Sequence, residues 1–391
     1  MAFVSTAAAT PNAPATGSVQ FVFSSDAHYG ITRPAFRGAK DVDARTVNQA
    51  LVASINRLAT AAFPGDGGIG AGGPVGPVDF FVEGGDVSNR EEIVDGKAIE
   101  TSELTWREFR DDYRKLNLTD RAGGPMQLFV VPGNHEASDA VGFYKPMEPA
   151  RDPSALIAAY NLMMKPAVPL TAATYHYDRD RIHASRDVGG VHFVFLHVWP
   201  DSAGRAWMTQ DLQRVPRTTP VVIFTHDQPE SDAKHFINPN GAHDINATDM
   251  FENLLSDRLA DGPATTSGTT IEQTAFEDFV AAHPNIRAYF HGNSNFNQFY
   301  DWTGPHGRVA LHTFRVDSPM KGAISKDDET KLSFQIATVD VALRTMTVRE
   351  VFWNAHPDHP ALTWGGSTTV ALSPRLNPEG AATLSFPGGP R

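Results

Sequence analysis

Short apolar runs alternate with amphipathic stretches along the first part of the chain. Apolar residues recur at helical spacing through residues 42–63, whereas residues 19–23, 78–82 and 126–131 are apolar runs with the length of buried strands. Residues 64–77 are mostly glycine and proline, so we expect a loop there. This part of the chain therefore predicts strands joined by helices.

Strands become more frequent later in the chain. Further strands are expected at residues 174–177, 191–196, 220–224, 286–290, 308–314, 332–339 and 344–351, and further helices at residues 96–116, 205–215, 247–259 and 270–282. Residues 227–246 form a long loop of the kind that often carries function. Strands that first alternate with helices and then follow one another predict an α/β sandwich in one domain.

Composition sets the limits of this domain. Residues 1–18 are rich in small residues and are expected to be a flexible leader, residues 19–355 the domain, and residues 356–391 a proline- and glycine-rich extension. The leader resembles the start of a mature periplasmic or secreted protein, although a cytoplasmic protein with a plain tail is an equal alternative. No run approaches the roughly 20 apolar residues of a membrane span.

Charge and cysteine content exclude several classes of function. Lys and Arg number 33 against 45 Asp and Glu, which gives a formal net charge of −12. A surface of this sign repels nucleic acid, so no nucleic-acid partner is expected. There are no cysteines, which excludes disulfides, thiolate metal sites and cysteine nucleophiles.

Polar residues of a restricted kind directly follow four of the expected strands. They are Asp26 and His28 after residues 19–23, Asp86 after 78–82, Asn134 and His135 after 126–131, and His226 after 220–224. Ligands of open α/β sheets bind outside the carboxyl ends of the strands. We therefore expect these side chains to meet in one crevice.

The residue types suit a pair of divalent metal ions. Asp26 and His28 lie two positions apart, on the same face of an extended segment, so both can hold one ion. A carboxylate such as Asp86 can bridge two ions about 3.5–4 Å apart, the spacing of two-metal phosphatases. Glycines beside Asp86 and Asn134 let the backbone approach such ions closely. Asn89 is expected to have a structural role as a helix cap.

The ordered words DAH, GGDVSN, PGNHE and THD resemble the calcineurin-like metallophosphoesterases, whose pattern runs D-x-H, G-D, G-N-H-[D/E], H and G-H-x-H. The resemblance spans residues 19–315, and the word GNHE is its most specific part. It implies a metallophosphoesterase-type sandwich of two mixed β-sheets flanked by helices. It also implies a dinuclear metal centre that hydrolyses phosphate esters.

The resemblance assigns a role to each motif residue. Asp26 and His28 would bind the first metal ion and Asp86 would bridge both ions. Asn134 and His226 would bind the second ion. His135 would be the catalytic proton donor to the leaving alkoxide, with no ligand role, while metal-bound hydroxide attacks phosphorus.

The last motif departs from the pattern. The segment HGNSN after residues 286–290 places Asn293 and Asn295 where the family has two histidines. Because asparagine binds through a carbonyl oxygen, the site favours Mn²⁺, Mg²⁺ or Ca²⁺ over Zn²⁺ or Fe. His291 precedes the glycine and is a candidate for a vacated ligand position. His197 ends another expected strand and is a candidate to line the crevice.

Three alternatives follow from this departure. The site keeps two ions with asparagine ligands, keeps one ion bound chiefly by Asp26, His28 and Asp86, or belongs to a non-catalytic protein that binds metal or a phosphorylated ligand. Retention of His135 favours an enzyme, a phosphomonoesterase or phosphodiesterase acting on a small-molecule phosphate ester. Arg315 and Lys321 are the nearest candidate phosphate-binding cations late in the chain, and His235 lies in the loop that could cover the substrate.

Overall fold

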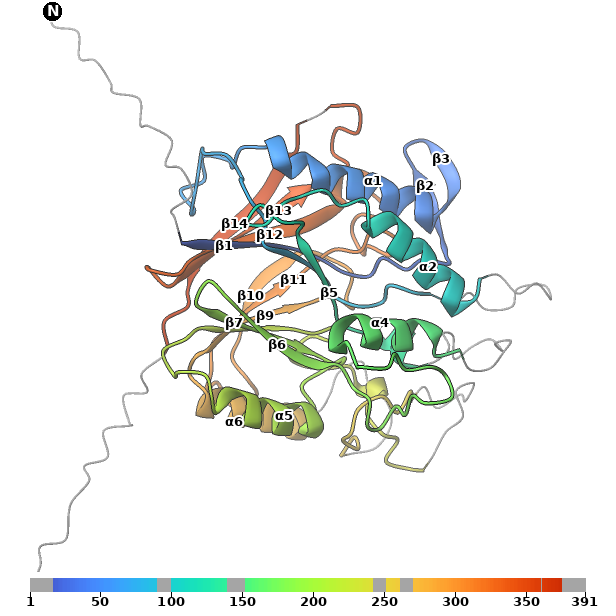
Figure 1. Cartoon of the computed structure of the whole chain (residues 1–391), viewed down its shortest axis with the longest axis vertical. Coiled ribbons are helices and arrows are strands. Elements are labelled where there is room, and N and C mark those ends of the chain that lie inside the picture. The colour runs from blue at the N-terminus through green and yellow to red at the C-terminus, as the bar shows by residue number, and fades with distance from the viewer. Residues whose placement is uncertain are drawn as a thin grey trace, which may run out of the picture.

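Two six-stranded β-sheets pack face to face and helices cover their outer surfaces (Figure 1). This computed structural model describes residues 17–89, 100–138, 152–241, 251–260, 270–359 and 361–374. Both sheets mix parallel and antiparallel pairs of strands. The predicted sandwich of two mixed sheets flanked by helices is confirmed.

The first sheet has the order β14-β13-β12-β1-β4-β5. Its strands are β1 (Ser18–Ser24), β4 (Phe80–Glu83), β5 (Gln127–Val130), β12 (Ser333–Asp340), β13 (Thr345–Phe352) and β14 (Thr363–Ala371). β1, β4 and β5 run parallel, whereas β12, β13 and β14 add antiparallel neighbours. Because β14 pairs with β13, the domain extends at least to Ala371 instead of ending at residue 355.

The second sheet has the order β10-β11-β9-β8-β7-β6. Its strands are β6 (His183–Val188), β7 (Val191–Leu196), β8 (Val221–Phe224), β9 (Ile286–His291), β10 (Gln298–Trp302) and β11 (Leu311–Arg315). β7, β8, β9 and β11 run parallel. A separate hairpin, β2 (Thr32–Phe36) with β3 (Ala39–Asp43), lies between β1 and the first helix.

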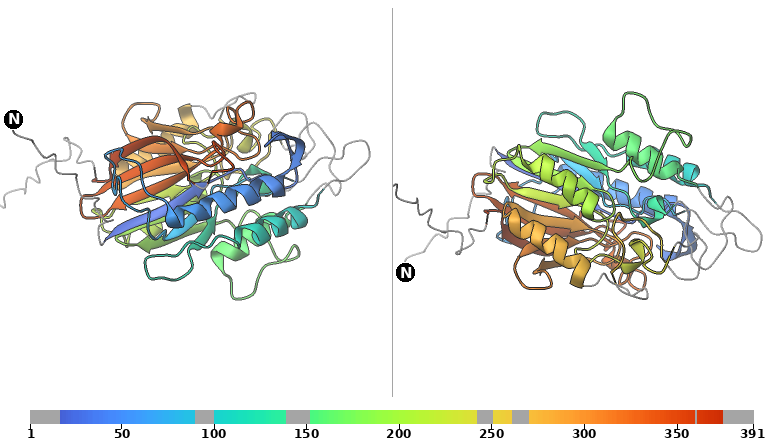
Figure 2. Two further views of the ribbon diagram at one scale, coloured as in Figure 1. Left: turned by 90° about the horizontal axis from the view of Figure 1, so that it is seen from above. Right: turned by 90° about the horizontal axis from the view of Figure 1, so that it is seen from below.

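Helices lie on both outer faces of the sandwich, as Figure 2 shows from above and from below. The described α-helices are α1 (Ala44–Asn56), α2 (Ser102–Tyr113), α3 (Asn134–Ala137), α4 (Ser154–Met164), α5 (Ser202–Leu212) and α6 (Thr270–Ala282), with short 3₁₀ turns at Arg57–Thr60, Ala233–His235 and Glu329–Lys331. α1 buries Val47, Leu51 and Ile55, one face of a helix of 3.6 residues per turn. The side chain of Asp43 caps its first turn.

Phenylalanine rings fill the space between the two sheets. Phe21 of β1 stacks on Phe80 with ring centroids 5.1 Å apart, and contacts Phe193, Phe224 and Phe290 of the second sheet at 5.7, 5.3 and 5.2 Å. All five side chains are buried. Such pairs add about 0.5–1.5 kcal/mol each beyond the burial of apolar area. The rings therefore fix how the two sheets face each other.

Two predicted elements were wrong. Residues 174–177 form turns instead of a strand, because Thr174 and Asp180 donate backbone hydrogen bonds to carbonyls a few residues earlier. The predicted helix 247–259 is absent from its described part, residues 251–259. Its apolar spacing instead serves a buried loop, in which Leu254 and Leu255 both donate to the carbonyl of His235.

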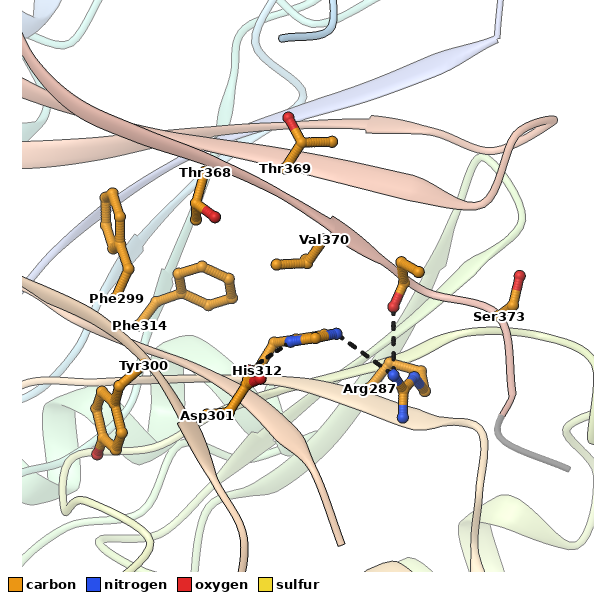
Figure 3. A pocket seen from close by; sticks show the side chains of 11 residues that line it. Arg287, Phe299, Tyr300, Asp301, His312, Phe314, Thr368, Thr369, Val370 and Ser373 are labelled. Carbon is orange, nitrogen blue, oxygen red and sulfur yellow. Dashed lines mark hydrogen bonds and ion pairs between the residues drawn. The ribbon is translucent and has the colours of Figure 1, made fainter. Parts of the chain in front are cut away.

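A pocket of about 620 Å³ opens between β14 and the second sheet (Figure 3). Arg287 reaches into it because it is the extra residue of a β-bulge, where Val221 and Val222 pair with residues 286 and 288. Its guanidinium lies 3.3 Å from His312 Nε2. The pocket is at the start of β9, whereas the motif loop follows the end of that strand, so the two sites are separate. No helix in the described ranges is long and apolar enough to cross a membrane.

An ion pair between the buried Arg349 and the partly exposed Asp66 holds the loop of residues 64–77 on the first sheet. Arg349 of β13 donates to both carboxylate oxygens of Asp66, at 2.7 and 2.9 Å, and to the carbonyl of Ile69 at 3.0 Å. Burial alone would raise the pKa of Asp66, but the hydrogen bonds from Arg349 and the Gly68 amide outweigh it and lower the pKa to about 2. The glycine-rich loop is therefore held by one bidentate contact.

We expect Asp66→Asn to lower the free energy of unfolding by about 1 kcal/mol at pH 7, because solvent screening at this partly exposed carboxylate reduces the ~1.4 kcal/mol per pKa unit. Because the folded pKa is below the unfolded value of 3.8, this contribution is complete above pH 3.8 and is lost as the pH falls towards 2. Urea unfolding at several pH values measures it. The exposed Asp327→Asn is the control, and a difference that does not shrink at low pH would contradict the assignment.

Candidate metal centre

The motif loops from both sheets meet around one carboxylate. Asp86 Oδ2 lies 3.3 Å from His226 Nε2, 3.6 Å from His135 Nε2 and 3.8 Å from His28 Nε2. Asp26 Oδ1 is 3.5 Å from the same nitrogen of His28. All five side chains are nearly or fully buried. The predicted convergence of the four strand ends is confirmed for these residues.

The backbone reaches this arrangement through left-handed conformations. Asp26, His28 and Asp86 have φ values of 60°, 43° and 52°, which are uncommon for residues with a side chain. Gly133 is required beside them, because a Cβ at this position would collide with the Asp86 carboxylate. Strained backbone of this kind persists where the surrounding structure enforces it, and it is concentrated at functional sites.

Glu136 holds the two loops that carry Asp86 and His135. Its Oε2 accepts the amides of Gly133 and Asp86 at 2.9 and 3.0 Å, and its Oε1 accepts the Ser88 amide at 2.7 Å. In return, Asp86 Oδ1 accepts the amide of His135 at 2.9 Å. Burial and the charge of Asp86 raise the pKa of Glu136 to about 7. Glu136 is the fourth residue of the word GNHE, so the sequence contained a signal for this positioning role, but no role was predicted for Glu136.

Within the described residues, two groups of side chains have the spacing of metal ligands. One consists of His28, Asp86 and His135, and the other of Asp26, Asp86 and His226; in each group the candidate ligand atoms lie within 4.8 Å of one another. Asp86 belongs to both groups, the position that a bridging carboxylate needs. His135 falls in the first group, although the resemblance gives it no ligand role.

The atoms left without partners test whether a metal fits. Asp26 Oδ1, both ring nitrogens of His28 and His226 Nε2 are buried and have no hydrogen-bond partner among the described residues. Such atoms cost about 1–3 kcal/mol each unless something satisfies them. His226 Nδ1 lies 2.8 Å from the carbonyl of Gly84, which leaves Nε2 to face the centre. Buried carboxylate oxygens and imidazole nitrogens without hydrogen-bond partners are suitable ligands for a divalent metal ion.

The electrostatics of the centre follow from its buried charges. Burial alone would raise the pKa of Asp86, but His135, His226 and His28 hold it well below its usual value. Burial alone would lower the pKa of His226, but Asp86 raises it to about 10. Burial lowers the pKa of His135, and the charge of Lys321 lowers it further. A metal ion would therefore displace a proton from His226.

The altered motif lies against the same centre. The amide of Asn293 donates to Asp26 Oδ2 at 3.1 Å, and its side-chain nitrogen donates to Asp227 Oδ1 and Gln228 Oε1 at 3.2 and 3.3 Å. These two acceptors orient the amide, so the carbonyl oxygen of Asn293 faces the other way. The side-chain nitrogen of Asn295 donates to the backbone carbonyl of Asn293 at 2.9 Å, and the Oδ1 of Asn295 is buried without a partner among the described residues.

The other sequence candidates have different positions. His291 is buried, with Nδ1 3.0 Å from the Gly292 carbonyl and Nε2 3.1 Å from the Tyr300 hydroxyl, and it belongs to neither ligand group. His197 is buried next to Tyr177, 3.2 Å from its hydroxyl. Asn134 is buried and begins α3, one residue before His135. Asn134 therefore lies next to His135 in the chain, whereas His291 and His197 have other contacts.

Two further contacts were not predicted. His235 Nδ1 lies 2.7 Å from Asp227 Oδ2, and both side chains are fully buried, which ties the long loop to the residue after His226. Lys321 Nζ donates to Asn89 Oδ1 at 2.8 Å and lies 3.3 Å from His135 Nε2. Asn89 is therefore part of the rim of the centre. Lys321 and His135 are far apart in sequence, and no local pattern indicates their contact.

No protein-family model matches the chain, and no curated protein matches it. The structure is similar to a dimetal phosphatase from Danio rerio, with 12% sequence identity, a TM-score of 0.49, and coverage of 91% of this chain and 99% of that one. It is also similar to the calcineurin-like phosphoesterase YfkN from Bacillus subtilis, with 10% identity, a TM-score of 0.32 and 90% of each chain covered. Both likenesses have TM-scores below 0.5, at sequence identities of 12% and 10%.

A third similar structure is a phosphopantetheinyl hydrolase from Mycobacterium tuberculosis, with 13% identity, a TM-score of 0.32, and coverage of 78% of this chain and 91% of that one. At such identities the likeness concerns the fold alone. The metallophosphoesterase-like arrangement of this chain is therefore interpreted from its own side chains, which combine the motif residues with the altered GNSN segment.

We expect Glu136→Gln to weaken metal binding about 10- to 100-fold, because its amide nitrogen would face backbone donors and release the Asp86 loop. Competition with a chromophoric chelator measures the affinity. Glu103→Gln, on the exposed first turn of α2, is the matched control. Equal metal affinity in both variants would show that Glu136 does not position Asp86.

Proposed function

We propose that this protein is a metal-dependent phosphoesterase that hydrolyses a small phosphate ester. The observation that carries the proposal is the pair of candidate ligand groups that share Asp86, with buried ligand atoms that have no partner among the described residues. Two divalent ions bound there would stabilise charge on the phosphoryl oxygens and lower the pKa of a water nucleophile. The motif residues supply the rest of the chemistry.

The ligand roles follow from position. Asp86 would bridge the two ions, and Asp26, His28 and His226 would hold them from the ends of β1 and β8. Asn134 joins from the first turn of α3. Asn293 and Asn295 ligate through their carbonyl oxygens, a proposal supported by the orientation of Asn293 and the unpartnered Oδ1 of Asn295. An oxygen-rich donor set favours Mn²⁺, Mg²⁺ or Ca²⁺ over Zn²⁺.

His135 donates a proton to the leaving oxygen. Its Nε2 lies at the rim of the centre, 3.6 Å from Asp86, with a side-chain exposure of 11% against 0–4% for Asp26, His28, Asp86 and His226. It is thus the imidazole of the centre that an entering ester reaches first. General acid catalysis of this kind contributes about 10²- to 10⁴-fold.

A non-catalytic protein that binds metal or a phosphorylated ligand is the second candidate. The side-chain nitrogen of Asn293 is held by Asp227 and Gln228, where an imidazole ligand would be expected in the family. A centre with weaker ligands on one side would hold metal less tightly. The two candidates differ in turnover, so the same preparation tests both.

We expect the Mn²⁺-loaded protein to contain about two metal equivalents, as in other two-metal sites. Asp86→Asn should lose both, because Asp86 belongs to both ligand groups, whereas His226→Ala should lose one. Elemental analysis after gel filtration measures this. Full metal content in Asp86→Asn would contradict a bridging role, and one equivalent in the wild type would favour the mononuclear alternative.

We expect His135→Ala to lower kcat by about 10²- to 10⁴-fold on p-nitrophenyl phosphate while metal content is unchanged. A leaving group of lower pKa needs less protonation, so the loss should be smaller for 2,4-dinitrophenyl phosphate. Steady-state kinetics with both esters measure the effect. Loss of metal from this variant would instead make His135 a ligand. If the wild type turns over neither ester with added Mn²⁺, Mg²⁺, Ca²⁺ or Zn²⁺, the binding-protein candidate replaces the enzyme.

A further inference from the structure

The turn that follows β11 is hydrogen-bonded to two of the motif loops. The amide of Val316 donates to the carbonyl of His291 at 3.2 Å, and Ser318 Oγ donates to the carbonyl of Asp26 at 2.8 Å. Further on, the amide of Ala323 donates to the carbonyl of Asn295 at 2.5 Å. The backbone of the turn is therefore fixed relative to the metal centre.

Arg33 supports the turn from the opposite side. This residue of β2 is 1% exposed, and its guanidinium donates to the carbonyls of Pro319, at 2.9 Å, and Ser325. Ser318 Oγ in turn accepts the amide of Lys321 at 2.9 Å. These buried contacts thus fix the backbone position of Lys321.

The side chain of Lys321 ends at the rim of the centre. Its ammonium lies between Asn89, which follows the Asp86 loop, and His135, at 2.8 Å from Asn89 Oδ1 and 3.3 Å from His135 Nε2. Lys321 is half-buried. A fixed positive charge thus stands beside the atom proposed to protonate the leaving oxygen.

The other cations near the centre have different environments. Arg315 lies over the rings of Phe296 and Tyr300, at 4.2 and 5.4 Å from their centroids. Lys234 lies 3.5 Å from Asp232 and 3.9 Å from Glu252. Of the two phosphate-binding candidates from the sequence, only Lys321 contacts a residue of the motif words in the described structure.

We propose that Lys321 binds a terminal phosphoryl oxygen of the substrate and selects phosphomonoesters over phosphodiesters. This inference rests on the proposed function. The phosphate would enter between Lys321 Nζ and His135 Nε2, and Lys321 would turn its N–H from Nε2 to a phosphoryl oxygen. Nε2, freed as an acceptor, would take a proton from solvent before it donates one to the leaving oxygen. Lys321 is then a specificity-determining residue, while His135 acts on the leaving oxygen.

The charge and shape of the two ester classes explain the selection. A phosphomonoester carries close to two negative charges at neutral pH, because its second pKa is about 6, whereas a diester carries one. Charge-assisted hydrogen bonds to an oxyanion are about twice as strong as neutral ones. In a diester, one of the terminal oxygens bears a second alkyl group, so an ammonium facing it loses an acceptor and meets added bulk.

The test uses Lys321→Met, which removes the charge and keeps an apolar stem, and Lys321→Arg, which keeps the charge. The exposed Lys326→Met is the matched control. The Mn²⁺-loaded proteins are assayed on p-nitrophenyl phosphate and on bis-p-nitrophenyl phosphate, and the affinity for inorganic phosphate is measured by calorimetry. The melting temperature of each variant shows whether it folds.

Lys321→Met should lower kcat/KM for the monoester about 10- to 100-fold and for the diester less than about 3-fold, with a matching loss of phosphate affinity. Lys321→Arg should recover most of both losses, and Lys326→Met should change neither. Equal losses on both esters with unchanged phosphate affinity would overturn the proposal. If the wild type hydrolyses neither ester, the proposed function fails, and the phosphate affinities of the three variants alone decide the role of Lys321.

Discussion

The buried carboxylate of Asp86 is the constraint on which the centre depends. A carboxylate that is 3% exposed costs several kcal/mol unless opposite charge and hydrogen bonds surround it. Three imidazoles and the amide of His135 meet this requirement, and they come from loops on both sheets. The phenylalanine core makes this geometry available, because it holds the carboxyl ends of β1, β4, β5 and β8 at one edge of the sandwich. The left-handed backbone at the motif residues, together with Gly133, then lets the motif loops approach the Asp86 carboxylate closely.

The central strands and the motif loops were predictable because their signals are local. An apolar run followed by Asp, His or Asn is visible within ten residues, and parallel strands place such ends together. The hairpin β2–β3 and the strands β6, β10 and β14 were missed, since exposed or half-buried strands lack a continuous apolar run. The predicted helix 247–259 was wrong for the opposite reason. Its leucines have helical spacing, but in the described part, residues 251–259, they pack against another loop. Contacts such as Lys321 with His135 depend on the whole fold.

The backbone of the GNSN segment suits its two asparagines and its glycine. Asn293 and Asn295 have φ values of 61° and 57°, a region that asparagine tolerates better than most residues. A Cβ at Gly292 would collide with Ser25 and Asp26, so the loop can approach the first strand end only with glycine there. The turn thus retains its close approach to Asp26, and the side chains presented from it offer carbonyl oxygens in place of imidazole.

The buried guanidinium of Arg33 links a hairpin near the start of the chain to a turn almost 300 residues later. The hairpin that carries it lies between β1 and α1 and pairs with no strand of either sheet. Its three described acceptors are backbone carbonyls, so the contact depends on the path of the turn and hardly on the turn's sequence. Substitutions of the turn's side chains would therefore leave the contact intact as long as the backbone keeps its path. Transplanting the lysine onto a related scaffold would require moving both segments as one module.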